Sequence, residues 1–194
     1  MKTAIILIGY QNDYFAEDGI LREVVEESSK VTNIIENTVN LINNCDDKLI
    51  ISTPIIFSES YAELSEPVGI LKTIRDVGAF KEGSKGSETI VELKAFEDKI
   101  IEIPGKLDLN AFNNTALEQT LKDNDINHIY LAGTVASICI DSTGRSAVER
   151  GFKVTMISDC ISGRTVFEKD FFCENIYPLY SDSVLSTEIC NGGK

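Results

Sequence analysis

The sequence predicts an α/β protein in which helices cover both faces of a mainly parallel sheet. Short apolar runs rich in β-branched residues recur along the chain, which is typical of buried strands. Segments in which apolar residues recur every three or four positions separate these runs, which is typical of amphipathic helices. Strands that alternate with helices usually pair in parallel, because a helix is the common connection between parallel strands. We therefore expect a three-layer α/β/α architecture.

The predicted strands are apolar runs that end at glycine, proline or polar residues. The first strand, Thr3–Ile8, is continuously apolar, as a strand covered on both faces should be, and Gly9 ends it. The second ends before Pro54, because proline lacks the N–H that a strand ladder uses. The second to sixth predicted strands cover 48–53, 99–103, 129–132, 153–157 and 183–187.

The predicted helices lie between these strands. The longest covers 24–45, where apolar residues recur at mixed three- and four-residue spacings. The stretch 55–87 has glycine and proline punctuation and no clean period, so we expect loops with one short helix near 70–77. Further helices are predicted over 88–96, from a cap at Asn114 or Thr115 to Asn124–Asp125, from Cys139 to Arg150 and over 168–179.

Length and charge limit the classes of function. With 194 residues the chain fits one domain, 1–194, around one core. Eighteen basic and 31 acidic residues give a formal charge of −13, which repels nucleic acid and anionic membrane surfaces. The apolar run 4–8 is too short for a signal sequence or a membrane span. We expect a cytoplasmic protein whose partner is a small molecule, with no nucleic-acid or membrane partner.

The chain has five cysteines, an odd number, which are widely spaced and form no CxxC pair. This pattern indicates neither a disulfide framework nor a cysteine zinc site, so we expect reduced thiols. The residues are Cys45, Cys139, Cys160, Cys173 and Cys190.

The carboxyl ends of the predicted strands indicate where a site would form, because ligands of parallel sheets bind beyond those ends. The segments that follow the first four strands are 9–13, 54–59, 104–106 and 134–139. They include Lys106, which could bind an anion or favour a thiolate, and Cys139. Each residue also has a simpler interpretation, since a lysine is commonly a solvated surface residue and a free cysteine a buried structural one.

Cys139 follows a strand and a tight turn, and it precedes a helical pattern. The N–H groups at a helix N-terminus favour an anion such as a thiolate. The same groups could stabilise the oxyanion that forms when sulfur attacks a carbonyl carbon. This turn is therefore a candidate site for nucleophilic catalysis.

Three segments together resemble the isochorismatase-like cysteine hydrolase family, and they cover most of the chain in register. The segments are AIILIGYQNDYFAEDGIL, GKLDLNAFNNTALEQTL and YLAGTVASICIDSTGRSAVERGFKVTMISDCIS. The resemblance implies a Rossmann-like fold with a six-stranded, mainly parallel sheet. It also implies an Asp–Lys–Cys triad, a homo-oligomer of two or more chains, and no cofactor.

The resemblance assigns residues by motif position. The family's lysine falls on Lys106 and its nucleophile on Cys139. A non-proline cis peptide of the family falls at Thr134–Val135, and it would direct the amides of Val135 and Cys139 at one oxyanion. These two amides are thus the expected oxyanion hole.

The chain departs from the family at position 9, where Gly9 stands in place of the catalytic aspartate. Three explanations remain open. Lys106 and Cys139 form a dyad, or a nearby acid, Asp13 or Glu59, substitutes for the aspartate, or hydrolysis has been lost. If strand one keeps its register, Gly9→Asp should raise activity.

The leading interpretation is a cysteine hydrolase that acts on a small amide or related C–N bond. The alternative is a catalytically degenerate member that binds a small ligand or a partner. Hydrolysis of a vinyl ether, as by isochorismatases proper, is less favoured because those enzymes lack the cysteine and depend on the aspartate. A thiol redox sensor is a further class, with Cys160 as the candidate resolving partner of Cys139.

A metal site is not expected. Nicotinamidases of the family use an Asp/His/His site after strand two, whereas the single histidine here, His128, precedes strand four at the opposite sheet end. We interpret Glu59, Glu63 and Glu66 as parts of a solvated loop. Apolar residues of the late helix favour an oligomer, because they exceed what one core needs. These are Phe167, Phe171 and Phe172.

Overall fold

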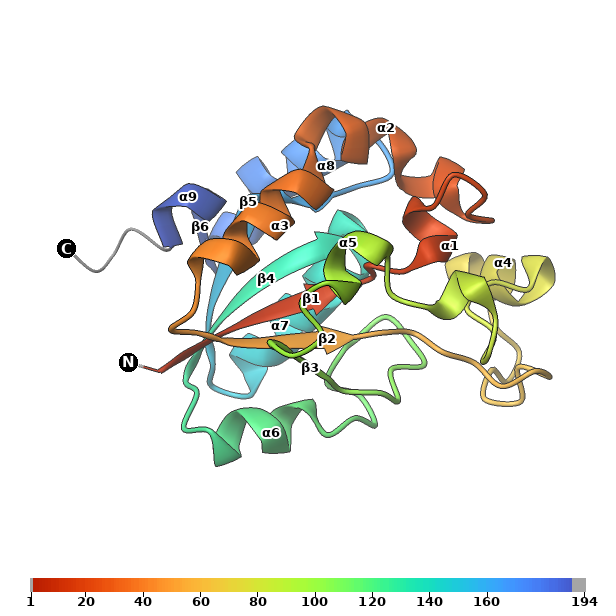
Figure 1. Cartoon of the computed structure of the whole chain (residues 1–194), viewed down its shortest axis with the longest axis horizontal. Helices are drawn as coiled ribbons and strands as arrows, with labels where there is room; N and C mark the ends of the chain where they lie inside the picture. Colours follow the sequence, from red (N-terminus) through yellow and green to blue (C-terminus); the bar gives the residue numbers. More distant parts are fainter. Residues whose placement is uncertain (1, 190–194) are drawn as a thin grey trace.

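A computed structural model describes residues 2–189, which form a six-stranded, all-parallel sheet with helices on both faces (Figure 1). The strand order is β3-β2-β1-β4-β5-β6. The first three strands are therefore added toward one edge of the sheet and the last three toward the other, with β1 and β4 adjacent at the centre. This confirms the predicted fold class. The strands are β1 (Thr3–Ile8), β2 (Leu49–Thr53), β3 (Ile100–Glu102), β4 (His128–Thr134), β5 (Lys153–Ser162) and β6 (Asp182–Val184).

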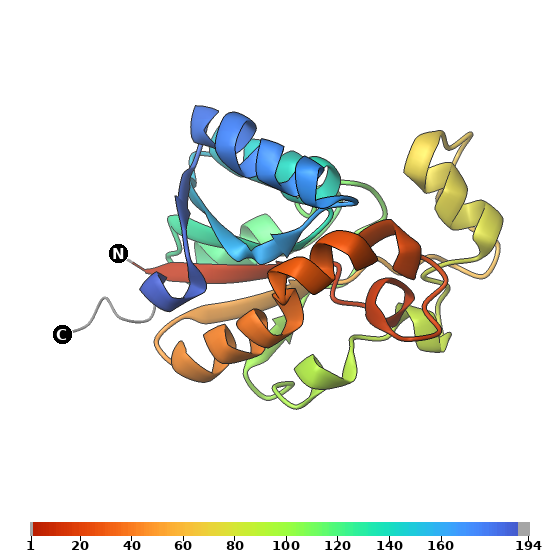
Figure 2. The same ribbon diagram turned by 90° about the horizontal axis from the view of Figure 1, so that it is seen from above.

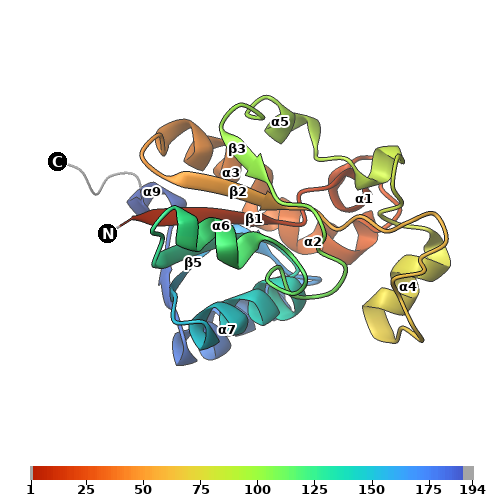
Figure 3. The ribbon, with the colours of Figure 1, turned by 90° about the horizontal axis from the view of Figure 1, so that it is seen from below.

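The helices form two layers around the sheet. In Figure 1, α3 and α6 lie on opposite sides of the strands, and Figure 3 shows α6 and α7 on the same side. The helices are α1 (Asn12–Phe15), α2 (Arg22–Thr32), α3 (Ile34–Asn44), α4 (Gly69–Val77), α5 (Val91–Lys94), α6 (Leu117–Asp123), α7 (Asp141–Glu149), α8 (Val166–Phe171) and α9 (Ser186–Ile189). A π-helical turn, Ala136–Ile140, precedes α7.

The apolar run of β1 divides its side chains between the two faces. Ile6 and Ile8 pack with α6 and α7, whereas Ile5 and Leu7 pack with α3 and α5. This alternation places one buried cluster on each face, as the side-chain period of a strand requires. The continuous apolar run is thus explained by burial on both faces.

The central strands approach each other closely at Gly133. A Cβ atom added at this position would lie 1.9 Å from the Ile8 carbonyl oxygen, and φ is +128°. A side chain would therefore push β4 away from β1. Glycine at this point lets the carboxyl ends of the two central strands meet.

A third apolar cluster covers the carboxyl edge of the sheet. It joins α1 and α2 to the segment that follows β2, and Tyr14, Phe57, Phe80 and Val135 belong to it. Figure 2 shows α4 extending away from the sheet at this end. The irregular segment 55–87 thus supplies much of the cover over the strand ends.

Several predicted elements differ from the structure, and three of these differences have a clear cause or consequence. The long helix 24–45 is two helices, because Asn33 adopts a left-handed conformation with φ of 50° and ends α2. Residues 186–189 are helical, since the carboxylate of Asp159 accepts hydrogen bonds from the amide and the hydroxyl of Ser186. β5 extends to Ser162, so Cys160 lies within that strand and does not follow it.

The cysteines also differ in part from expectation. Cys139, Cys160 and Cys173 carry free thiols, whereas Cys45 is disulfide-bonded, so the prediction of reduced thiols is wrong for Cys45. Cys190 lies outside the described residues. No helix within residues 2–189 is both long and apolar enough to cross a membrane.

Candidate active site

The structure brings Lys106 and Cys139 together at the carboxyl edge of the sheet. Lys106 Nζ lies 3.6 Å from Cys139 Sγ and donates a hydrogen bond of 2.5 Å to the Asp108 carbonyl oxygen. Both residues are buried, with 1% of Lys106 and 5% of Cys139 exposed. The pair therefore combines a potential nucleophile with a group that can carry a proton.

The backbone around each residue explains its position. The Thr134–Val135 peptide bond is cis, and the amides of Ile138 and Ile140 both donate to the Val135 carbonyl oxygen. These bonds close the π-helical turn that carries Cys139. Lys106 pairs with Ile55 in an isolated parallel bridge, which extends the β2–β3 edge beyond the strand ends.

Gly9 lies beside this pair, and its backbone conformation disfavours a side chain. Ile8, the residue before Gly9, pairs with Thr53 on one side and with Gly133 on the other. The φ of Gly9 is +77°, and an added Cβ atom would lie 2.9 Å from the Thr134 carbonyl oxygen. The backbone therefore does not suit the aspartate that the resemblance places here.

A small cavity adjoins the pair. Its volume is about 10 Å³, which is close to the space that one water molecule needs. It is lined by Ile8, Gly9, Gln11, Tyr14, Thr53, Ile55, Lys106, Thr134 and Cys139. Tyr14 and Ile55 of the third apolar cluster form part of this lining.

Comparison with known proteins identifies the family. The family model described as the isochorismatase domain matches residues 3–188 of the sequence. The chain belongs to the isochorismatase family. Nicotinamidase 3 of Arabidopsis thaliana is 25% identical over 157 residues, which cover 81% of this chain and 71% of that protein. The uncharacterized isochorismatase family protein PncA of Bacillus subtilis (strain 168) is 26% identical over 172 residues, covering 84% and 87%.

Solved structures share the fold of this isochorismatase-family chain. A cysteine hydrolase from Pseudomonas syringae pv. phaseolicola 1448A superposes with a TM-score of 0.83 at 18% identity, covering 97% of this chain and 91% of the other. N-carbamoylsarcosine amidase from Thermoplasma acidophilum gives a TM-score of 0.75 at 19% identity, covering 97% and 99%. At these identities the likeness establishes the fold.

Neither acid considered as a substitute for the family's aspartate lines the cavity. The Asp13 carboxylate accepts a hydrogen bond of 2.6 Å from the Phe80 amide, and an oxygen of this carboxylate lies 2.1 Å from where a Cβ atom of Gly86 would be. Asp13 thus holds the irregular segment 55–87 in place through this hydrogen bond. Glu59 is exposed in the loop after β2. Of the three explanations left open by the sequence, a substitute acid therefore gains no support from the cavity lining.

Sequence reasoning missed three cavity residues in this isochorismatase-family site. Burial raises the pKa of the Tyr14 phenol, and the charges of Cys139 and Asp13 raise it further, so Tyr14 keeps its proton. The side-chain amide of Gln11 donates to the carbonyl oxygens of Ile55 and Ser87 and accepts from the Ile55 backbone amide. These bonds hold both ends of the irregular segment 55–87 near the strand ends. Thr53 is the third. Gln11 lies in the strand-end segment 9–13, whereas Tyr14 comes one residue after that segment and Thr53 is the last residue of β2.

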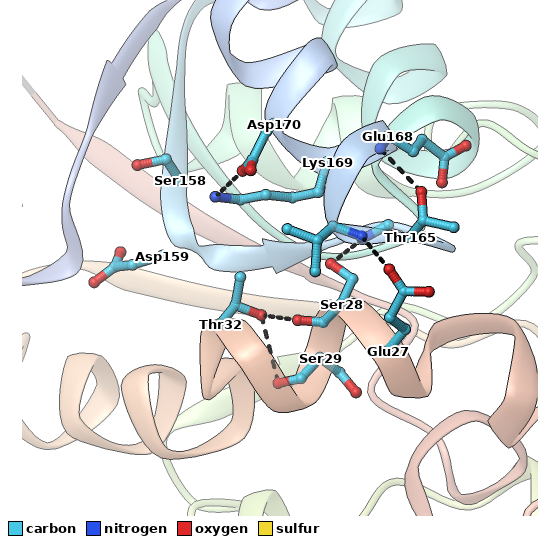
Figure 4. Close-up of polar contacts among 12 residues, drawn as sticks. Glu27, Ser28, Ser29, Thr32, Ser158, Asp159, Thr165, Glu168, Lys169 and Asp170 are labelled. Atoms are coloured by element: carbon cyan, nitrogen blue, oxygen red, sulfur yellow. Dashed lines mark hydrogen bonds and ion pairs between the residues drawn. The ribbon is translucent and has the colours of Figure 1, made fainter.

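A glutamate supports the turn from outside. The Ser137 hydroxyl donates to the Glu168 carboxylate, which also accepts from the Arg164 amide at 2.5 Å. The Glu168 amide in turn donates to Thr165 Oγ1 at 3.0 Å and starts α8 (Figure 4). Glu168 therefore links the π-helical turn to α8.

Cys160 and His128 lie away from the pair. Cys160 packs in the cluster on the face opposite to that of Cys139, and burial raises the pKa of its thiol to about 12. This placement contradicts its suggested role as a resolving cysteine. His128 begins β4, where its Nε2 lies 2.8 Å from Thr155 Oγ1 and burial lowers its pKa. Among residues 2–189, no group of three or more His, Cys, Asp or Glu could hold a metal ion.

Proposed function

We propose that the chain is a cysteine hydrolase that cleaves an amide or a related C–N bond in a small molecule. The observation that carries the proposal is the 3.6 Å separation of Lys106 Nζ and Cys139 Sγ, two buried groups. A buried ammonium needs a negative partner, because an unpaired buried charge is costly. Within residues 2–189, the partners of Nζ are the Asp108 carbonyl oxygen and Cys139 Sγ. The Cys139 thiolate is the anion that fits this place.

The pairing of a Lys106 ammonium with a Cys139 thiolate explains how the site could work with Gly9 in place of the aspartate. The triad of the family contains a carboxylate, which Gly9 does not supply. Without the carboxylate, a thiolate and an ammonium together leave the site neutral. The negative charge that the aspartate carries in the family thus moves to sulfur, and no separate base is needed to remove the thiol proton.

The proposed reaction has two steps. The thiolate attacks the carbonyl carbon, and the C–N bond then breaks as the Lys106 ammonium gives a proton to the leaving nitrogen. In the second step water adds to the thioester while neutral Lys106 takes a proton from it. The C–S bond then breaks, which restores the thiolate and releases a carboxylic acid. The amides of Val135 and Cys139 are the proposed oxyanion donors.

The test is release of amine or ammonia from a panel of small amides and carbamoyl compounds. Neighbours of the fold named nicotinamidase and N-carbamoylsarcosine amidase support this choice of compounds. We expect Cys139→Ala to lower turnover at least ~10³-fold, because the nucleophile is lost. Cys173→Ala, which removes a free thiol outside the cavity, is the control and should retain activity. Equal turnover by Cys139→Ala and the natural chain would refute the proposal.

One observation favours the alternative of a catalytically degenerate binding protein. The cavity of about 10 Å³ holds no amide substrate without movement of the covering cluster. If no compound of the panel is turned over while one of them raises the melting temperature saturably, the protein is a binding module. Turnover that depends on Cys139 excludes this alternative.

We also propose a homo-oligomer. Phe167 and Phe171 of α8 are 77% and 43% exposed, and their rings stack with centroids 6.1 Å apart. Phe172, by contrast, packs partly buried against the core. Exposed aromatic surface of this kind favours association. Sedimentation velocity at micromolar concentration is expected to show a dimer or larger species that Phe167→Ser weakens, and a monomer throughout would contradict this.

A further inference from the structure

Thr53 ends β2 beside the Lys106–Cys139 pair, and its hydroxyl is unusual. The residue is 1% exposed, and its Oγ1 atom has no hydrogen-bond partner among the described residues. Buried hydroxyls are nearly always bonded to protein or to water, because an unpaired one lowers stability. Thr53 lines the cavity that also contacts Lys106 and Cys139. The residue with the unpaired hydroxyl therefore contributes to the cavity lining.

We propose that Thr53 Oγ1 holds one water molecule against the Lys106–Cys139 pair, in the space beside Gly9, and that this water hydrolyses the acyl enzyme. The cavity volume of about 10 Å³ is close to what a single water requires. A buried water also needs two or more polar partners. An ammonium has three N–H donors, and Asp108 O and Cys139 Sγ accept two from Lys106. The third N–H and Thr53 Oγ1 are the two partners.

The catalytic part of this inference rests on the proposed hydrolysis. After the amine leaves, Lys106 is neutral and Cys139 carries the acyl group. The water oxygen bonds to the acyl carbon, and Lys106 Nζ takes the proton that the water loses. The C–S bond then breaks, so that thiolate, ammonium and carboxylic acid result. Thr53 is a positioning residue, because it acts by orienting the water.

The first test of the water site needs no enzyme activity. It asks whether Thr53→Val raises or lowers the melting temperature. Thr53→Val keeps the side-chain shape and removes the hydroxyl. If the cavity holds water, the variant leaves that water with one partner fewer, and we expect a lower melting temperature. If the cavity is dry, the variant removes an unpaired hydroxyl and the melting temperature rises, which would overturn the proposal. Thr143→Val calibrates the experiment, because Thr143 Oγ1 accepts a hydrogen bond of 3.1 Å from the Ala111 amide.

The role of the water is tested by burst kinetics with an activated ester or amide. Thr53→Val should leave the burst, which reports acylation, within about twofold and slow the following phase by ~10–10²-fold, since a misplaced reactant costs this much. Thr53→Ser, which restores the hydroxyl, should recover most of the second rate. Equal slowing of both phases, or no rescue by serine, would overturn the assigned role.

The two failures are distinguishable. If the natural chain shows neither burst nor turnover, the proposed hydrolysis and the catalytic role of the water fail together. The melting temperatures of Thr53→Val and Thr143→Val still decide whether the water site exists.

Discussion

Lys106→Met is expected to slow alkylation of Cys139 near neutral pH by ~10–10³-fold and to abolish amide hydrolysis, because an opposite charge within about 4–6 Å changes the thiolate fraction by such factors. Methionine keeps the length of the side chain and removes its charge. Without the ammonium 3.6 Å away, Cys139 Sγ loses the cation that favours its ionised form. The measurement is the rate of iodoacetamide modification against pH, with the modified cysteine located by peptide mass.

Stability should respond to Lys106→Met in a different way. Removing a buried charge relieves its desolvation, whereas the Asp108 carbonyl oxygen loses its partner. These terms oppose each other, so we expect the free energy of unfolding to change by no more than about 2 kcal/mol. Lys48→Met is a matched control, because the Lys48 side chain is only 9% exposed but precedes β2 at the other end of the strand. Equal alkylation rates in the natural chain and Lys106→Met would contradict the pairing.

Gly9→Asp is expected to lower the free energy of unfolding by about 1–3 kcal/mol and not to raise hydrolysis above that of the natural chain. The φ of +77° disfavours any side chain, and the new Cβ atom would lie 2.9 Å from the Thr134 carbonyl oxygen. The added carboxylate would also compete with the Cys139 thiolate for Lys106. This reverses the gain in activity that the sequence alone predicts for the substitution.

Gly9→Ala separates the two effects, because alanine carries the same backbone penalty and no charge. Denaturant unfolding should show similar losses for Gly9→Ala and Gly9→Asp. Alkylation near neutral pH should be slower in Gly9→Asp than in Gly9→Ala, since only the aspartate offers Lys106 a second anion. Hydrolysis by Gly9→Asp that exceeds the natural rate would show that the site lacks only a base.

The site was partly predictable because its residues follow the ends of parallel strands. Gly9, Lys106 and Cys139 come directly after or soon after such ends, and the parallel sheet brings those ends to one edge. The orientation of Asp13 was not predictable, because its carboxylate turns toward the Phe80 amide, which is distant in the sequence. A carboxylate in a strand-end segment can thus bond to the backbone of another segment and not to the Lys106–Cys139 pair.

The sequence by itself determined most of the strands, the parallel sheet and the candidate nucleophile, because apolar periodicity and strand-to-helix punctuation are local properties of the chain. Only the tertiary structure decided that Lys106 is buried against Cys139 and that Gly9 has a backbone conformation that disfavours a side chain. It also decided that the Thr53 hydroxyl has no described partner. The physical reason is that burial, close contact and backbone dihedral angles at this edge depend on how β1, β2 and β4 pack together.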